Sequence, residues 1–340
     1  MQITTVGLDL AKLVFQVHGV DAQGRTVLTK QLKREQLTAF FAQLPPCLVG
    51  MEACASAHHW ARVLRDLGHD VRLIAAQFVK PYVKSNKNDA ADAQAICEAV
   101  SRPSMRFVAI KSIEQQTVLS MHRAREGFVK ARTAMGNQIR GLLAEFGIIL
   151  PVGLANIRPR VPALLEAAAD RLPAALTYLI TQLVEHLTLL DERVKDLERQ
   201  ITSWHRHDEL SQRLAQIPGI GPMTASALIA TVGNPALFKN GRQMAAWIGL
   251  VPRQHSSGGK PTLLGISKRG DSYLRRLLTL GAQSALIRSR RPGASPSWAG
   301  QLLQRRHVNV VATALANKNA RIAWALMTKS EPYDPNYLPT

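Results

Sequence analysis

Four carboxylates in the first third of the chain have the side-chain type and spacing of a divalent-metal site. Asp9 and Glu52 each follow a short apolar run whose residue types favour a buried strand, so each acid is expected near a strand end. Asp89 and Asp92 are three residues apart at the start of a run with helical spacing, so they share one helix face. Four converging carboxylates repel one another unless hard cations neutralise them. The set therefore predicts bound Mg²⁺ or Mn²⁺, which would act together with substrate phosphates.

Each acid also has an ordinary structural interpretation. Asp9 and Glu52 are the kind of polar residue that ends a strand, and Asp89 is a common type of helix cap. For any single acid this interpretation is the better one. The occurrence of four acids, in the order strand, strand and helix, favours the metal site.

The segments between the acids predict a mixed α/β domain. Strands are expected at residues 3–8, 13–20, 25–32, 47–51 and 71–75, and helices at 34–44, 58–67 and from 89 onward. Three strands followed by helix, strand, helix, strand and helix is the order of an RNase H-like (RuvC-like) nuclease core. In that core, acids on the first strand, the fourth strand and the last helix meet, and these are the places of the four acids here.

The charge balance indicates a polyanionic partner. The 340 residues are enough for two or three domains, and they include 43 Lys and Arg against 24 Asp and Glu, a formal net charge of +19. Double-stranded DNA or structured RNA suits such an excess. A membrane is not an expected partner, because no apolar run approaches the roughly 20 residues of a spanning helix and no signal peptide is apparent. Three cysteines without metal-site spacing favour a reducing, cytoplasmic compartment.

Two long helices are expected in the middle of the chain, separated by a break at residues 147–162 that is rich in Pro and Gly. The first covers 112–146 and carries cations that suit either a solvated face or contact with a nucleic-acid backbone: His122, Arg123, Arg125, Lys130, Arg132 and Arg140. In the second, apolar residues from Leu176 to Trp204 alternate at spacings of four and three, as in a coiled coil. Its charged flanks favour a coil between subunits over a hairpin within one chain, and hence an oligomer.

Two glycine-containing segments follow. The PGIG turn, with Gly219 and Gly221, resembles the turn of helix-hairpin-helix modules that hold a DNA backbone; a plain turn between core helices is the alternative. Residues 249–278 predict a mobile loop, then a helix from about residue 272, with four cations that would bind nucleic acid: Arg253, Lys260, Lys268 and Arg269. Ser256 and Ser257 lie in the middle of this loop, where cations would assist a serine that attacks a phosphodiester. From composition alone, inert surface serines are the simpler interpretation.

Three sequence blocks together resemble the DEDD transposases of the one-ten type of bacterial insertion sequences, also described as bridge-RNA-guided recombinases. The blocks are GLDLAK with MEACAS and KNDAADA, then IPGIGPMTASALIA, then GLVPRQHSSGGK with GISKRGDSYLRRLL. Their order and separations match over nearly the whole chain. The resemblance implies a RuvC-like catalytic domain at residues 1–110, a helical coiled-coil oligomerisation region at 111–210, and a mainly α transposase domain with a helix-hairpin-helix-like motif at 211–330.

The resemblance also implies roles and partners. By motif, the catalytic residues would be the four metal-binding acids and a serine nucleophile: Asp9, Glu52, Asp89, Asp92 and Ser257. The neighbouring Ser256 is the alternative nucleophile. The protein would cleave and exchange DNA strands of an insertion sequence. Its partners would be double-stranded DNA, a structured guide RNA and further copies of itself, as a dimer or as a tetramer on DNA. It would act in the bacterial cytoplasm, associated with the nucleoid.

Two other functions fit the same residues. One is a metal-dependent, structure-specific endonuclease resembling Holliday-junction resolvases, in which water is the nucleophile and Ser257 only supports its loop. The other is a basic nucleic-acid-binding scaffold without enzymatic activity, which leaves the four acids unexplained. Metal-dependent nicking would exclude the scaffold, and a DNA adduct that survives denaturant would separate serine chemistry from hydrolysis.

Overall fold

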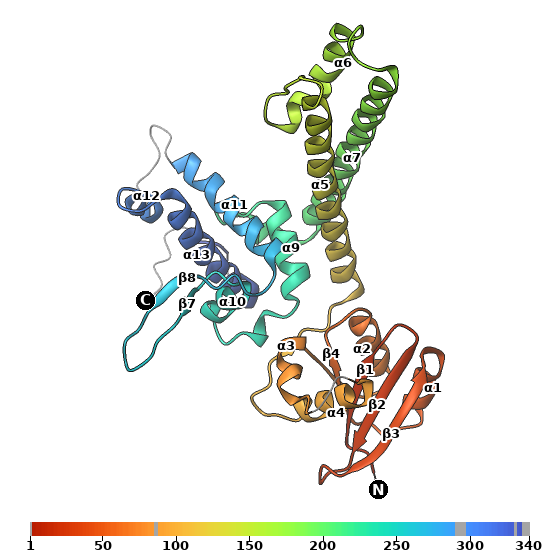
Figure 1. The fold of residues 1–340 in the computed structure, drawn as a ribbon. Coiled ribbons are helices and arrows are strands. Elements are labelled where there is room, and N and C mark those ends of the chain that lie inside the picture. Colours follow the sequence, from red (N-terminus) through yellow and green to blue (C-terminus); the bar gives the residue numbers. More distant parts are fainter. Residues whose placement is uncertain (1, 85–87, 290–296, 330–331, 335–340) are drawn as a thin grey trace. The chain divides into compact units, whose positions relative to one another are not determined.

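The computed structural model describes residues 2–84, 88–289, 297–329 and 332–334. The chain forms two compact units, residues 1–112 and residues 113–340. The first contains a sheet and the second is mainly helical (Figure 1), which confirms the expected α/β region followed by a helical remainder. No helix within the described residues is long and apolar enough to cross a membrane.

A six-stranded mixed sheet forms the centre of the first unit. Its strands are β1 (Thr5–Leu10), β2 (Val14–Val20), β3 (Thr26–Lys33), β4 (Leu48–Glu52), β5 (Asp70–Ile74) and β6 (Phe107–Val108). They lie in the order β3-β2-β1-β4-β5-β6. β1, β4 and β5 are parallel, whereas β2, β3 and β6 are antiparallel to their neighbours. All five expected strands are present within two residues of their expected bounds, and the short β6 is an addition.

Helices cover both faces of this sheet. α1 (Leu37–Ala42) and α2 (Ala57–Asp66) pack on the face that carries Val6 and Leu8. α4 (Asp89–Val100) packs on the opposite face, where its backbone meets β1, and the short α3 (Ala76–Val79) precedes it. Because successive strand residues point to opposite faces, β1 alternates between core side chains and positions that face α4.

The second unit consists of helices and one small β-hairpin. The helices are α5 (Ile113–Ala144), α6 (Ile157–Ala167), α7 (Ala174–His207), α8 (Glu209–Ala215), α9 (Pro222–Val232), α10 (Gly241–Ile248), α11 (Ser272–Ser289), α12 (Trp298–Leu303) and α13 (Val308–Thr328), and the strands are β7 (Pro252–Gln254) and β8 (Leu263–Ile266). The expected break at 147–162 is partly wrong, because α6 begins inside it. Pro159 is tolerated there since it falls in the first turn of α6, where an amide hydrogen has no helical partner.

α5 and α7 pack against each other as a hairpin within one chain. Ile180 and Leu187 of the predicted seam join a buried cluster with Ile139 and Leu143 of α5. None of the nine seam residues from 176 to 204 is exposed. The seam therefore packs against α5 of the same chain. The expected coiled coil between subunits is replaced by a hairpin within one chain.

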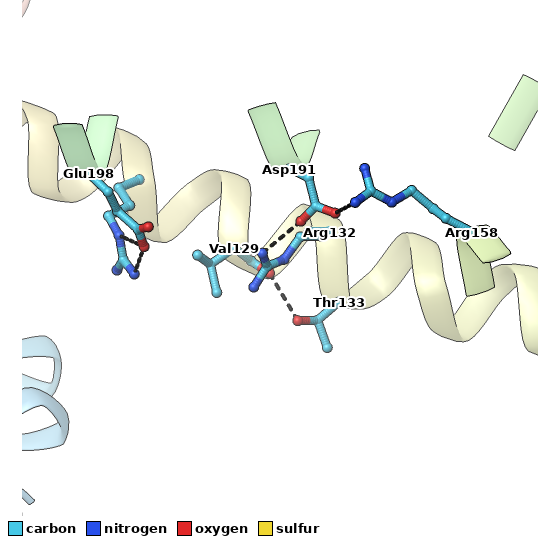
Figure 2. Close-up of polar contacts among 7 residues, drawn as sticks. Val129, Arg132, Thr133, Arg158, Asp191 and Glu198 are labelled. Atoms are coloured by element: carbon cyan, nitrogen blue, oxygen red, sulfur yellow. Dashed lines mark hydrogen bonds and ion pairs between the residues drawn. The ribbon is translucent and has the colours of Figure 1, made fainter. Parts of the chain in front are cut away.

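Ion pairs between α5 and α7 account for part of the charge on both helices (Figure 2). Arg125 Nε donates to Glu198 at 2.9 Å, and Arg132 Nη1 donates to Asp191 at 2.8 Å. Arg158 Nη2 of α6 lies 3.7 Å from the second carboxylate oxygen of Asp191. Arg125 and Arg132 thus hold the hairpin together, because their charges are paired with carboxylates of the same chain.

His122, another cation candidate of α5, is fully buried in the second unit. Its Nδ1 lies 2.9 Å from the Tyr273 hydroxyl on α11, and its Nε2 lies 3.0 Å from Ser226 Oγ on α9. Burial, with a smaller effect from the charge of Arg125, lowers the pKa of His122 to about 4. The imidazole is therefore neutral near pH 7, and it joins three helices by hydrogen bonds instead of contacting a polyanion.

Candidate active site

The parallel pairing of β1 and β4 makes Asp9 and Glu52 neighbours. The last paired residues of the register are Leu8 and Met51, so the next residues along each strand lie side by side at the carboxyl ends. Leu8 and Met51 are fully buried in the core on one face of the sheet. Alternation along the strands turns Asp9 and Glu52 to the other face, which α4 covers.

Two glycines let α4 approach that face closely. A Cβ atom on Gly7 would lie 2.1 Å from the carbonyl oxygen of Ala93, and one on Gly50 would lie 2.7 Å from Cβ of Val100. Each glycine precedes one of the strand acids by two residues and therefore shares its face. This repeated pattern of glycine, any residue and acid is a signal for the site that the sequence itself contains.

The amino-terminal turn of α4 supplies the other two acids. Asn88 is the N-cap, because its side chain accepts a hydrogen bond from the amide of Ala91 at 2.8 Å. Asp89 is therefore the first helical residue, and the interpretation of Asp89 as a cap is wrong. Asp89 and Asp92 both lie in the first turn, where the positive end of the helix dipole stabilises their carboxylates.

Three of the four acids converge. One carboxylate oxygen from each of Asp9, Asp89 and Asp92 lies within 4.8 Å of the others. Glu52 is not a member of this close group, yet its negative charge acts on the carboxyl group of Asp9. The pKa of Asp9 is raised to about 6, chiefly by burial and then by the charges of Asp92, Asp89 and Glu52. A set of oxygen donors with unbalanced negative charge is chemically suited to a hard divalent cation.

Cys54 lies beside this cluster but does not act as a thiolate. Burial and the charges of Glu52 and Asp9 raise the pKa of its thiol. A protonated thiol is a poor nucleophile and a poor metal ligand. Cys47 and Cys97 are buried, and all three cysteines are free thiols.

We expect Gly7→Ala to displace α4 and with it the helix acids. The new methyl group would meet backbone atoms of Ala93 and Cys97, which cannot turn away as a side chain can. Overpacking of this kind should lower the free energy of unfolding by about 1 to 3 kcal/mol, measured by urea denaturation. Gly127→Ala is the matched control, because a Cβ atom at Gly127 meets no atom within 4 Å. Equal stability of the two variants would contradict the close packing.

In the second unit, the loop between β7 and β8 forms a tight hairpin tip around Ser257. The Lys260 amide donates to the Ser257 carbonyl at 3.1 Å, closing a four-residue turn. Its central residues, Gly258 and Gly259, have φ of 54° and 76°. Positive φ at both centres is the type I′ turn that suits two-residue hairpins, and it explains why glycine stands at both positions.

The hairpin distinguishes its two serines. Ser256 Oγ accepts hydrogen bonds from Gln254 Nε2 at 2.9 Å and from the Thr262 amide at 3.4 Å, so it is held within the loop. Ser257 points to the opposite face, and its hydroxyl makes no hydrogen bond with the residues that the structure describes. Lys260 pairs with Ser257 across the turn, so their side chains lie on one face, with Cβ atoms about 5 Å apart.

The four predicted cations of this segment are exposed. Arg253 and Lys260 lie on the hairpin, and Lys268 and Arg269 lie between β8 and α11. None forms an ion pair with any carboxylate in the described part of the chain. They are therefore available to a polyanion.

The PGIG turn connects α8 and α9, and its two glycines differ. Gly219 has φ of 92°, and a Cβ atom there would lie 2.7 Å from the carbonyl oxygen of Gly281 in α11. Its place is thus explained by packing in the helical core. Gly221 is the exposed N-cap residue of α9, with open space beside it. Only Gly221 remains accessible to a phosphate.

Comparison with known proteins identifies the class to which these arrangements belong. Residues 6–148 match the model of a DEDD transposase family, described as "Transposase". Residues 211–298 match the model described as "Transposase IS116/IS110/IS902 family". Together, the two matches identify the chain as a DNA transposase, an enzyme that recombines DNA strands.

Full-length relatives are similar to this chain. The "Probable family 20 transposase" of Pseudomonas aeruginosa is 55% identical over 98% of this chain and 100% of its own length. The "Transposase for insertion sequence element IS1328" of Yersinia enterocolitica is 47% identical over 96% of this chain and 97% of its own. The corresponding IS1111A transposase of Coxiella burnetii is 45% identical over 97% and 91%. The chain therefore belongs to the IS110/IS116 family of insertion-sequence transposases.

Proposed function

We propose that the four acids bind Mg²⁺ or Mn²⁺ and act with Ser257 to cleave and rejoin DNA strands at an insertion sequence. The observation that carries this proposal is the convergence of Asp9, Asp89 and Asp92, where burial first and then the neighbouring negative charges raise the pKa of Asp9. The strand order, with acids on β1, β4 and α4, supports an RNase H-like, RuvC-like fold for the first unit. The donor set fits a hard cation, because every candidate ligand is a carboxylate.

In this proposal the acids hold the cation that stabilises charge, and Ser257 forms and breaks the bond to phosphorus. A divalent cation held by the acids would supply Lewis-acid stabilisation of charge on the scissile phosphate. Ser257 Oγ would form a bond to phosphorus while the bond from phosphorus to one sugar oxygen breaks. The serine proton passes to solvent, and the leaving oxygen takes up a proton. Lys260, on the same face as Ser257, would stabilise the developing negative charge. The phosphoserine ester keeps the energy of the broken bond, so rejoining needs no external energy source.

Metal-dependent nicking of DNA tests this function against a scaffold. The purified protein, given a plasmid that carries the element ends and its flanking DNA, should nick it in Mg²⁺ or Mn²⁺. A chelator should stop the reaction while binding to the plasmid persists, because binding depends on the cationic surface. Nicking that continues unchanged with chelator would show that the reaction needs no divalent cation and would contradict the proposed metal site.

The proposed nucleic-acid partners follow from the charge and the family. The exposed cations Arg253, Lys260, Lys268 and Arg269 would contact phosphates of double-stranded DNA or of a structured guide RNA. Gly221 at the start of α9 supports a helix-hairpin-helix-like phosphate contact. In this proposal, residues 1–110 bind the metal, residues 111–210 mediate assembly, and residues 211–330 carry the serine nucleophile. DNA binding would associate the protein with the nucleoid.

The surface proposed for assembly as a dimer, or as a tetramer on DNA, is the free end of the α5–α7 hairpin (Figure 1). Five large apolar side chains are exposed there: Phe146, Ile149, Val152, Tyr178 and Leu179. Residues 141–190 contain three arginines and four acids, whereas the whole chain has a charge of +19. Two copies can therefore meet at this end without the like-charge repulsion that opposes contact elsewhere.

Charges at the hairpin end should dissociate the oligomer. We expect Ile149→Asp combined with Val152→Asp to lower the mass in sedimentation velocity to that of a monomer. Both side chains are more than 70% exposed, so folding of the chain should be unaffected. Ile287→Asp changes an exposed apolar residue of α11 and should leave the mass unchanged. A double variant with the wild-type mass would exclude this end as the interface.

A further inference from the structure

An open groove lies between the base of the serine hairpin and α13 in the second unit. Its volume is about 840 Å³, and Pro252, Leu264 and Ile266 of the hairpin form one wall. Val310, Ala314 and Asn317 of α13 lie along the other side, at helical spacings of four and three. The opposite stripe of α13, which includes Val311 and Ala316, is buried in the core. One face of α13 therefore packs in the hydrophobic core, and the opposite face lines the groove.

The groove combines an aromatic surface with positive charge. Trp298 lines it and is 46% exposed, although an indole of this size is usually more deeply buried. Lys318 Nζ lies 5.2 Å from the centre of the Trp298 ring, and Arg321 lies one helical turn further along α13. Among the described residues that line the groove, none is acidic. An exposed ring beside two cations and an asparagine matches the chemistry of base stacking with backbone neutralisation.

We propose that this groove holds unpaired nucleotides of the DNA strand next to the phosphate that Ser257 attacks. The inference rests on the proposed function, because the same hairpin forms the groove wall at its base and carries Ser257 at its tip. Ser257 is the fifth residue after Pro252, and five steps of extended strand span about 17 Å. That length corresponds to about five stacked nucleotides. Exchange of strands requires unpaired bases near the break, and a base stacked on Trp298 would keep the freed strand from pairing again with its former partner.

Binding of short oligonucleotides to variants tests the groove. Fluorescence anisotropy would compare single-stranded oligothymidylate with a duplex of equal length at moderate salt. We expect Trp298→Ala to weaken single-strand binding about tenfold while duplex binding changes less than about twofold. Trp298→Phe, which keeps an aromatic face, should restore most of the loss. Lys318→Ala should weaken single-strand binding more than Arg305→Ala, which removes an exposed cation outside the groove. Equal losses for single strand and duplex, or no loss, would overturn the proposal.

Photocrosslinking identifies the bound strand directly. An oligonucleotide containing 5-iododeoxyuridine should crosslink to the peptide that contains Trp298, and the matched RNA containing 5-iodouridine should crosslink less. Preference for RNA, or crosslinks only elsewhere, would overturn the assignment to DNA. Ser257→Ala protein should give the same crosslink as wild type. Failure of the serine chemistry would then be distinguishable from failure of the groove.

Discussion

Asp92→Asn should reduce strand cleavage on the order of a thousandfold or more while leaving nucleic-acid binding intact. The substitution keeps the shape of the side chain and removes a carboxylate from the group that includes Asp9 and Asp89. Binding should persist because removing a negative charge does not weaken contact with a polyanion. Asp9→Asn should have the same effect. Cleavage would be measured on a plasmid with element ends, and binding by gel shift.

Stability measurements separate the loss of a metal ligand from misfolding. Because the acids repel one another, each Asn variant should be at least as stable as wild type without metal. Adding Mg²⁺ should raise the unfolding temperature of wild type and not that of the variants, since a ligand stabilises only the state that binds it. Asp66→Asn, an exposed acid of α2, is the control and should retain both cleavage and the response to Mg²⁺. Cleavage above about a tenth of wild type in Asp92→Asn would contradict the assignment.

Ser257→Ala should abolish strand exchange, and Ser256→Ala should not. Ser257 is exposed at the turn and faces the same side as Lys260, whereas Ser256 accepts hydrogen bonds inside the loop. Loss of a covalent nucleophile should reduce exchange by at least about a thousandfold. Ser256→Ala should loosen the loop and reduce exchange only about threefold to tenfold. Exchange would be measured by sequencing junctions between element ends and target.

The hydrolytic alternative gives a different result for the same pair of variants. If water attacks the phosphate, Ser257→Ala should still nick DNA at close to the wild-type rate, and no junctions should depend on this residue. If Ser256 is the nucleophile, the two variants should exchange their behaviour. The comparison therefore distinguishes three assignments with two substitutions.

Much of the first unit could be predicted because its elements have strong local patterns. The strands that carry Asp9 and Glu52 are short apolar runs, and the start of α4 at Asp89 agrees with the expected helix, although the cap is Asn88 and not Asp89. The closeness of α4 to the sheet could not be predicted from those patterns. It depends on Gly7 and Gly50, whose effect appears only when two strands are paired in register.

In the second unit, local sequence patterns could not predict which surface a helix packs against. The seam on α7 has the same spacing whether its partner is another subunit or α5, so the pattern could not choose between them. The cations of α5 were also ambiguous, because Arg125 and Arg132 lie on the side that faces Glu198 and Asp191 only after the hairpin forms. The expectation of a mobile loop around Ser257 was wrong, because β7 and β8 pair as a hairpin there. The adjacent glycines Gly258 and Gly259 were the local signal for it, since they favour a type I′ turn.

The most direct test is to trap and map a covalent link between this protein and DNA. Wild-type protein, incubated with Mg²⁺, its guide RNA and a target strand nicked beside the scissile phosphate, should form an adduct that survives denaturant. Mass spectrometry should find the DNA on the peptide that contains Ser257, and both Ser257→Ala and Asp9→Asn should fail to form it while still binding RNA. A wild-type reaction that cleaves DNA without any adduct, or an adduct that persists in Ser257→Ala, would contradict the account.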